Sequence, residues 1–181
     1  YRRWDPTRSK LGAGLSRSRQ SQYELLPKEG DTCLYLGAGH GTSISHLHDH
    51  VCGANNEKDG RIIAVDLYPR CLRDLVHLST LRPGLVPVLG DARKHAAWGI
   101  IVSKKVDWLL QDVSQAGQTE IFIKAVKRFL KPGGKGLLSL KAASERFNEG
   151  GEKEVFRKVR EQLEDAGLNI EEQIDLHGLE D

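Results

Sequence analysis

A glycine-rich turn that follows a short apolar run constrains this 181-residue chain more than any other feature. The run 34–36 leads into the glycine-rich stretch 37–41, and a second apolar run, 61–65, ends at Asp66. Glycines let a backbone approach a ligand closely, and a carboxylate accepts hydrogen bonds from ribose hydroxyls. The spacing Gly37-x-Gly39-x-Gly41 differs from the dinucleotide pattern Gly-x-Gly-x-x-Gly. A tight strand-to-helix turn alone would also use such glycines, but with Asp66 the sequence favours a nucleoside cofactor, S-adenosylmethionine rather than NAD.

Apolar runs alternate with helical patterns along the whole chain. Strands are predicted for residues 32–36, 61–66, 85–89, 106–111, 135–141 and 169–176. Helices are predicted for residues 42–51, 69–80, 93–103, 118–130 and 152–166. Strands separated by helices imply a mostly parallel sheet with helices on both faces, so the predicted fold class is α/β.

Polar or glycine residues follow five consecutive predicted strands. In an open α/β sheet, ligands bind beyond the carboxyl ends of the strands, where the strand order reverses. These residues are therefore expected to meet at one edge of the sheet: the stretch 37–42, Asp66, Gly90-Asp91-Ala92, Gln111-Asp112-Val113 and Lys141.

Composition narrows the class of protein. The chain is 39% hydrophobic and 29% charged, which is typical of a soluble globular domain. Its apolar runs fall short of the roughly 20 residues that span a bilayer, so we expect no membrane partner. The three cysteines, Cys33, Cys52 and Cys71, form no CxxC pair, and buried free thiols in a reducing compartment are expected.

Positive charge is concentrated at the start of the chain. The first twenty residues carry six basic side chains and one acidic side chain, a net charge of +5, whereas the whole chain carries +2. Aromatic residues are interleaved with these cations, and this pattern indicates contact with a nucleic-acid backbone. A solvated leader is the alternative interpretation.

A histidine-rich segment permits a second interpretation. His46 and His50 would share one face of the predicted helix 42–51, with His48, Asp49 and Cys52 nearby, which invites a metal site. Because no second ligand pair lies close in sequence, a solvated histidine-rich helix is favoured and no metal is predicted.

Several motifs, in order and over nearly the whole chain, resemble the fibrillarin family, and most closely the archaeal fibrillarin-like proteins. The family's members are RNA-guided ribose 2′-O-methyltransferases of box C/D ribonucleoproteins. The motifs are Tyr1-Arg2-x-Trp4-x-Pro6-x-Arg8-Ser9-Lys10-Leu11, Leu34-Tyr35-Leu36-Gly37-Ala38, Ser45-His46, Gly90-Asp91-Ala92-Arg93, Gln111-Asp112-Val113-x-Gln115, and Lys135-Gly136 through Lys141-Ala142.

The resemblance implies a class I, Rossmann-like methyltransferase domain that uses S-adenosylmethionine. Three members of the family's Lys-Asp-Lys-His catalytic constellation fall on Lys10, Asp112 and Lys141. The implied cofactor-binding residues are Gly37, Ala38, Gly39, Thr42, Ser43, Asp66, Leu67, Asp91, Ala92, Asp112 and Gln115. RNA contacts are assigned to the basic residues Arg2, Arg3, Arg8 and Lys10. The implied partners are a box C/D guide RNA, the target rRNA or tRNA, a Nop-domain scaffold protein and a kink-turn-binding protein.

The chain also departs from the family's pattern. His40 stands where a small serine is usual, and is expected to narrow the cofactor loop. Asp66 replaces a glutamate, and Ala116-Gly117 replaces a proline-aspartate pair. The family's histidine would follow Asp181, and His177 lies too early to take its role. We therefore expect residues 1–181 to be a single methyltransferase domain that is a fragment, without the family's N-terminal β region and final strand.

Methyl transfer to a ribose requires alignment of two reactants and removal of a hydroxyl proton. Lys141 is the expected base, through partial desolvation at a strand end, with Asp112 orienting it or the hydroxyl and Lys10 holding phosphate or balancing charge. Two alternatives stay open: a non-catalytic module that binds scaffold and RNA, and a methyltransferase for protein glutamine or a small molecule. The expected location is cytoplasmic for an archaeal protein and nucleolar for a eukaryotic one.

Overall fold

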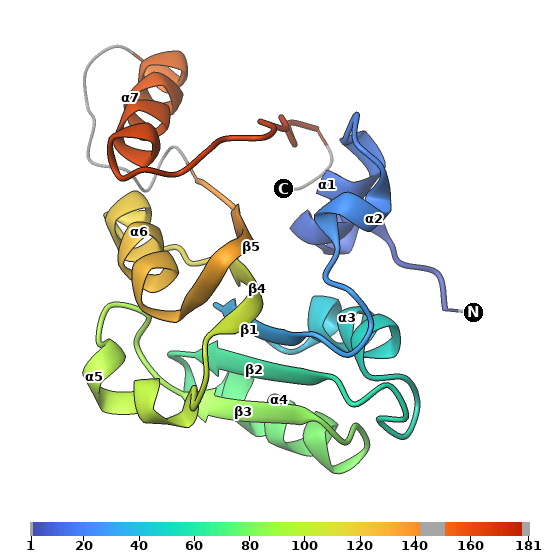
Figure 1. Cartoon of the computed structure of the whole chain (residues 1–181). Coiled ribbons are helices and arrows are strands. Elements are labelled where there is room, and N and C mark those ends of the chain that lie inside the picture. Colours follow the sequence, from blue (N-terminus) through green and yellow to red (C-terminus); the bar gives the residue numbers. More distant parts are fainter. Residues whose placement is uncertain (1, 142–150, 179–181) are drawn as a thin grey trace.

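Five parallel strands form the centre of the molecule (Figure 1). The structure is a computed structural model that describes residues 2–141 and 151–178. The strands are β1 (Thr32–Leu36), β2 (Arg61–Asp66), β3 (Leu85–Leu89), β4 (Val106–Gln111) and β5 (Leu130–Leu138). Their order is β3-β2-β1-β4-β5, so the direction of winding reverses between β1 and β4. A ligand site is expected at the carboxyl ends of these two strands.

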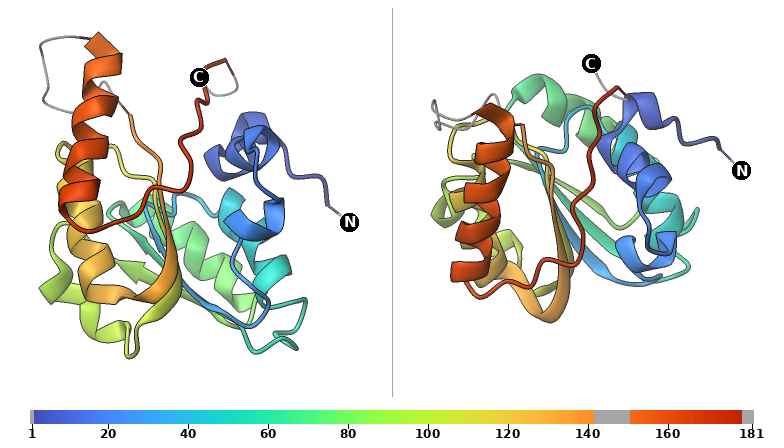
Figure 2. Two further views of the ribbon diagram at one scale, coloured as in Figure 1. Left: turned by 45° about the horizontal axis from the view of Figure 1, so that its top comes forward. Right: turned by 90° about the horizontal axis from the view of Figure 1, so that it is seen from above.

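Helices cover both faces of the sheet (Figures 1 and 2). One face carries α1 (Lys10–Arg17), α3 (Thr42–Val51) and α4 (Pro69–Thr80), with the short α2 (Gln22–Leu25) beside them. The other face carries α5 (His95–Trp98), α6 (Gln118–Phe129) and α7 (Gly151–Asp165). Two 3₁₀ turns, Pro6–Arg8 and Gly99–Ile101, precede α1 and follow α5.

The strands are apolar at consecutive positions because both faces of the sheet are buried. In β1, Cys33 and Tyr35 pack into the core under α3 and α4, whereas Leu34 and Leu36 pack into the core under α5 and α6. This alternation follows from the two-residue period of a strand. Within the described residues, no helix combines the length and apolar character needed to cross a membrane.

Four of the six predicted strands and four of the five predicted helices have the predicted bounds to within one residue. The fifth strand begins earlier than predicted, at Leu130, and its register shifts between Val106 and Trp108, so residues 131–134 lie between two paired positions. The helix predicted for 93–103 is instead the short α5 and a 3₁₀ turn. Gly99 and the β-branched residues after it are poor helix formers, which explains the interruption.

The prediction of a strand at 169–176 is wrong. This segment leaves α7 and crosses toward α1 (Figure 2). Its side chains alternate between half-buried and exposed, as they do in a strand with one covered face. A strand also needs a hydrogen-bonded neighbour, and the described part of this segment is held by side-chain contacts instead. The Arg17 guanidinium donates to the Asp175 carbonyl (2.7 Å), and the Lys135 ammonium pairs with Glu171 (3.0 Å).

Candidate active site

Lys10 and Asp112, both predicted catalytic residues, form an ion pair across 102 positions of sequence. Lys10 is the first residue of α1, and Asp112 follows the last residue of β4. Their side chains are 17% and 21% exposed, so the pair is largely shielded from solvent yet reachable from it. The pair lies beyond the carboxyl end of β4, the position that the topology favours for a ligand.

The first glycine of the cofactor loop packs directly against Asp112. Gly37 has a φ of +80°, and a Cβ at this position would run into the Asp112 carbonyl, well inside van der Waals contact. The Asp112 N–H donates to the Leu36 carbonyl (2.8 Å), which fixes the two strand ends together. Only a glycine permits this close approach.

Asp66 joins the cofactor loop to the start of α4. One carboxylate oxygen accepts from the Gly39 N–H (2.8 Å), and the other accepts from the Tyr68 N–H (2.9 Å). The side chain is buried at the end of β2. Leu67, the next predicted cofactor residue, is exposed beside it. A buried carboxylate with backbone donors is held in one position, where its remaining lone pairs are available to hydroxyls.

Asp91 and Gln115, predicted separately as cofactor residues, also lie together. The Gln115 amide donates to Asp91 Oδ1 (3.4 Å), and Arg93 forms an ion pair with the same carboxylate (2.7 Å). The hydrogen bonds from Arg93 lower the pKa of Asp91 to about 2. Ala92 is buried next to this pair. The carboxylate is therefore ionised at neutral pH.

Lys141, predicted at the end of a strand, lies beyond β5 and is exposed, so the desolvation that was expected to make it a base is absent. Its ammonium nitrogen donates to the Ser114 hydroxyl (3.2 Å). The strand β5 ends at Leu138, three residues before it, and this early end brings the side chain out to the edge of the site. The residues after it, 142–150, lie outside the described part of the chain.

The N-terminal arm, residues 2–9, is docked on α3. Trp4 stacks on His46 with ring centroids 5.0 Å apart, and the Arg2 guanidinium pairs with Asp49 (2.6 Å). At the end of the arm, the Ser9 hydroxyl lies 2.7 Å from the hydroxyl of Ser43, a predicted cofactor residue. The arm thus places Lys10 next to the cofactor loop.

Of the four predicted RNA-binding residues, two are engaged within the protein. Arg2 is paired with Asp49, and Lys10 is paired with Asp112. Arg3 and Arg8 have exposed side chains on the arm.

The three histidines of α3 have three different environments, which argues against a shared metal. His46 stacks on Trp4, the buried His48 ring lies 2.8 Å from the Pro83 carbonyl, and the His50 ring lies 2.8 Å from the Pro27 carbonyl. Burial lowers the pKa of both His46 and His48. Within the described residues, no group of three potential ligands is arranged to hold a metal ion. The solvated helix that was favoured over the metal is also wrong in part, because His48 is buried.

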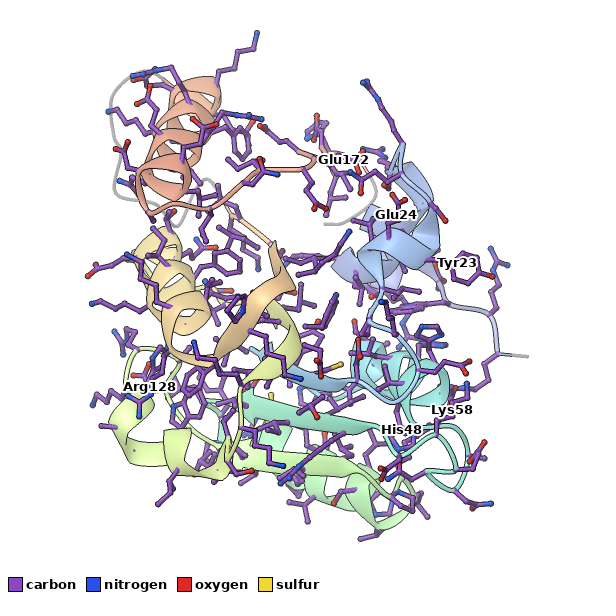
Figure 3. All side chains as sticks on the ribbon, viewed as in Figure 1. Tyr23, Glu24, His48, Lys58, Arg128 and Glu172 are labelled. Carbon is purple, nitrogen blue, oxygen red and sulfur yellow. The ribbon has the colours of Figure 1, made fainter. Side chains whose placement is uncertain are left out.

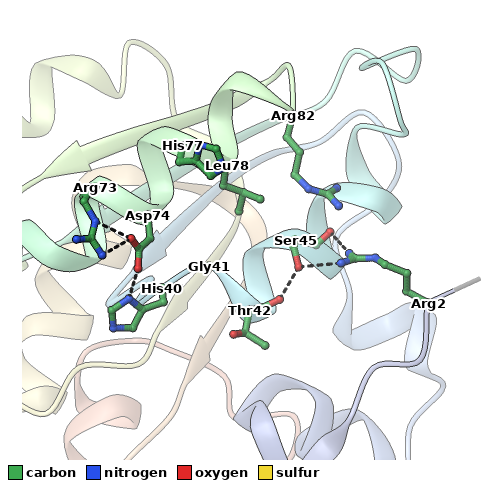
Figure 4. A pocket seen from close by; sticks show the side chains of 10 residues that line it. All are labelled: Arg2, His40, Gly41, Thr42, Ser45, Arg73, Asp74, His77, Leu78 and Arg82. Atoms are coloured by element: carbon green, nitrogen blue, oxygen red, sulfur yellow. Dashed lines mark hydrogen bonds and ion pairs between the residues drawn. The ribbon is translucent and has the colours of Figure 1, made fainter.

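His40 does not narrow the cofactor loop as expected. Its ring turns outward and pairs with Asp74 of α4 (2.6 Å; Figure 4). A cavity of about 620 Å³ opens beside this pair, between the arm, α3 and α4, and Arg2, Thr42 and Arg82 are among its lining residues. This cavity touches the cofactor loop at His40 and Gly41, but neither Lys10 nor Asp112 lines it.

The residues at the strand ends fit the cofactor that was predicted. Gly39 has a φ of +59°, and a Cβ built on it would have no atom within 4 Å, so the loop faces open space there. The Gln115 carbonyl oxygen is buried without a hydrogen-bond partner among the described residues. An open loop, a fixed carboxylate and an unsatisfied acceptor suit a ligand with hydroxyl and amino groups, such as S-adenosylmethionine.

Sequence reasoning missed two residues at this site. Ser114 contacts the Lys141 ammonium, and the buried Gln118 contacts the Lys141 backbone. The sequence carried no signal for Gln118, because its burial and its backbone partners are set by the fold.

Comparison with known proteins agrees with this geometry. The family model described as Fibrillarin matches residues 1–181. A relative named fibrillarin-like rRNA/tRNA 2′-O-methyltransferase, from Methanococcus voltae, is 38% identical over 99% of this chain and 74% of its own length. The structure of Aeropyrum pernix fibrillarin with natively bound S-adenosyl-L-methionine has a TM-score of 0.80 at 33% identity, over 97% of this chain and 72% of that one.

A chain from a fibrillarin/Nop5p complex matches with a TM-score of 0.77 at 34% identity, over 91% of this chain and 73% of that one. The fold described above agrees with that of these relatives over nearly the whole chain. The chain belongs to the fibrillarin family and has the fold of class I S-adenosylmethionine-dependent methyltransferases.

Proposed function

We propose that this protein transfers a methyl group from S-adenosylmethionine to a ribose 2′-hydroxyl of rRNA or tRNA. The observation that carries the proposal is the pairing of Lys10 with Asp112 directly against the Gly37 turn. It places a cation and a carboxylate, both partly exposed, at the edge of a cofactor loop. Relatives that share the sequence over nearly its whole length are named for this activity.

The bound cofactor supplies an electrophilic methyl group on a sulfonium sulfur. The chain's own residues position the RNA and remove the proton of the 2′-hydroxyl. The 2′-hydroxyl proton is assigned to Lys141 Nζ, which is exposed in the structure, so its role as the base requires that bound RNA cover it. Asp112 orients the hydroxyl, and Lys10 balances the charge of that carboxylate. Proton transfer to a positioned group contributes about 10²–10⁴ in rate, and alignment contributes further.

The choice of nucleotide is assigned to partners rather than to this chain. A domain that contacts only phosphate and ribose reads no sequence. A box C/D guide RNA paired with the target would supply specificity, held by a Nop-domain scaffold and a kink-turn-binding protein. Support for the scaffold comes from the relative that was solved as a fibrillarin/Nop5p complex.

The test compares two aspartates at opposite ends of β4. Asp112→Asn removes the carboxylate beside Lys10, and we expect kcat on guide-matched RNA to fall by about 10²-fold or more. Asp107→Asn is the matched control: Asp107 also pairs with a lysine, Lys131 (2.5 Å), but on the opposite end of β4. Its variant should retain activity within about threefold. The assay uses the full-length protein assembled with guide RNA and scaffold.

Normal methylation by Asp112→Asn would refute the assigned role. Equal methylation without guide RNA would favour a stand-alone methyltransferase. Binding of scaffold and RNA without methyl transfer by the wild-type assembly would favour the non-catalytic module.

A further inference from the structure

The backbone of Lys141 is held at both of its polar groups by one buried side chain. The Gln118 amide nitrogen donates to the Lys141 carbonyl (3.1 Å), and the Lys141 N–H donates to the Gln118 amide oxygen (3.1 Å). Gln118 is fully buried, at the first position of α6. A side-chain amide that pairs with both groups of one peptide residue reproduces the bonding of a neighbouring strand.

This contact occurs where the sheet no longer holds the chain. The strand β5 ends at Leu138, and the last backbone bond to β4 runs from the Ser139 N–H to the Gln111 carbonyl (2.8 Å). Lys141 lies two residues further on. The hydrogen bonds that the structure gives to its backbone end on Gln118.

Gln118 is itself fixed from the other catalytic strand. The Gln111 amide nitrogen donates to the Gln118 carbonyl (2.8 Å), and Gln111, also fully buried, directly precedes Asp112. A chain of amide contacts thus links the end of β4, the start of α6 and the end of β5. Asp112 and Lys141 are attached to its two ends.

We infer that Gln118 is a positioning residue that sets the distance and direction of Lys141 relative to Asp112; this inference rests on the proposed function. Lys141 is exposed, and its side chain has a hydrogen bond to Ser114 alone among the contacts described. Its reach toward a ribose hydroxyl therefore depends on where its backbone is held. A displacement of about 1 Å at a reacting group can reduce the rate about 10²-fold.

A double-mutant cycle separates this role from a general effect on folding. Gln118→Met keeps the length of the side chain and removes both contacts. We expect it to lower kcat by about 10–100-fold and to change the KM for RNA by less than about threefold. In a Lys141→Met background, the same change should alter the residual rate by less than about twofold. Equal losses in the two backgrounds, or no loss in the wild-type background, would overturn the inference.

Ile121→Val provides the control for stability. Ile121 is another buried residue of α6, and shortening it should reduce thermal stability while leaving kcat within about threefold. If Gln118→Met does not fold, Gln118→Asn takes its place, because it keeps the amide but shortens its reach.

Amide hydrogen exchange provides a test that needs no activity. The Lys141 N–H of the wild-type protein should be protected like a strand amide, and Gln118→Asn should lose that protection. Free exchange of this amide in the wild-type protein would overturn the inference even if methylation is normal. Conversely, a protected amide in a protein that does not methylate guide-matched RNA would refute the proposed function and leave the contact intact.

Discussion

At the scale of single residues, two glycines of the cofactor loop should respond differently to alanine. At Gly37, a Cβ would collide with the Asp112 carbonyl, which is backbone and moves only with β4. We expect Gly37→Ala to destabilise the fold by about 2–5 kcal/mol, since backbone strain and a forced displacement add. Urea unfolding followed by circular dichroism measures this loss.

The matched change is Gly39→Ala, where the added methyl group meets no atom within 4 Å. It should cost only about 1–2 kcal/mol for the left-handed backbone. Because the methyl group enters the open space above the loop, S-adenosylmethionine should bind more weakly in calorimetry. A Gly37→Ala protein as stable as Gly39→Ala would contradict the assigned packing.

Asp91 should make the stability of the protein depend on acid pH. Its pKa is lowered to about 2 by Arg93, so the pair stabilises the folded state above the unfolded pKa of about 4. That contribution should be lost as the pH falls from about 4 to about 2. Because Arg93 is half exposed, we expect the pair to contribute about 1–2 kcal/mol to the free energy of unfolding. Asp91→Asn should show a smaller decrease in unfolding free energy over this pH range than the wild-type protein does.

Several residues of the site could be predicted because they follow strands, and parallel strands end at one edge. Lys10 is different, because it begins α1 ahead of the first strand, and its assignment came from the family resemblance. Asp91 with Gln115, and Lys10 with Asp112, were named separately, and the structure brings each pair into contact. Gln118 could not be predicted, because its partners are backbone groups of a residue 23 positions away. Local sequence carries no record of such a contact.

At the scale of elements, the docked arm packs between α3 and α1, and we expect it to fix the position of α1. Trp4 stacks on His46 and also lies 3.0 Å from where a Cβ on Gly12 would be, so it fills the gap between α3 and α1. Trp4→Ala should cost about 1–2 kcal/mol and lower kcat about tenfold, because Lys10 begins α1. Thermal unfolding and single-turnover methylation measure the two effects.

Tyr23→Ala is the control for Trp4→Ala, since this aromatic side chain of α2 is 82% exposed (Figure 3). Its variant should keep both stability and rate. If loss of Trp4 left the rate unchanged, the arm would not be positioning Lys10.

The segment after α7 shows why strand prediction failed at one element. Apolar residues recur at every second position from 168 to 176 except at Glu172, but a strand also needs a hydrogen-bonded neighbour. Here Glu172 accepts from the Arg19 N–H (2.9 Å) and the Ser18 hydroxyl (2.6 Å) at the end of α1 (Figure 3). The periodicity of apolar residues indicates which side chains share a face. Whether the backbone pairs with a neighbouring strand is decided by tertiary contacts.

At the scale of the whole molecule, charge is divided between the arm and the remainder. The first twenty residues carry +5 and the rest of the chain carries −3. RNA should therefore approach the side that carries the arm and the site, and the binding constant should fall steeply with salt. The structure refines which cations contribute, because Arg2 is already paired with Asp49 while Arg3 and Arg8 are exposed.

The salt dependence of RNA binding tests this division of roles. Fluorescence anisotropy with a single-stranded RNA between about 50 and 200 mM salt gives the slope of log K against log salt, and each phosphate contact adds about 0.7. Arg3→Ala with Arg8→Ala should reduce the slope by about 1.4. Arg2→Ala should change the slope by much less, because the Arg2 guanidinium is already bound to Asp49 and to the Ser45 carbonyl rather than free to contact phosphate. Equal reductions for Arg2→Ala and for either exposed arginine would mean that the arm leaves α3 when RNA binds.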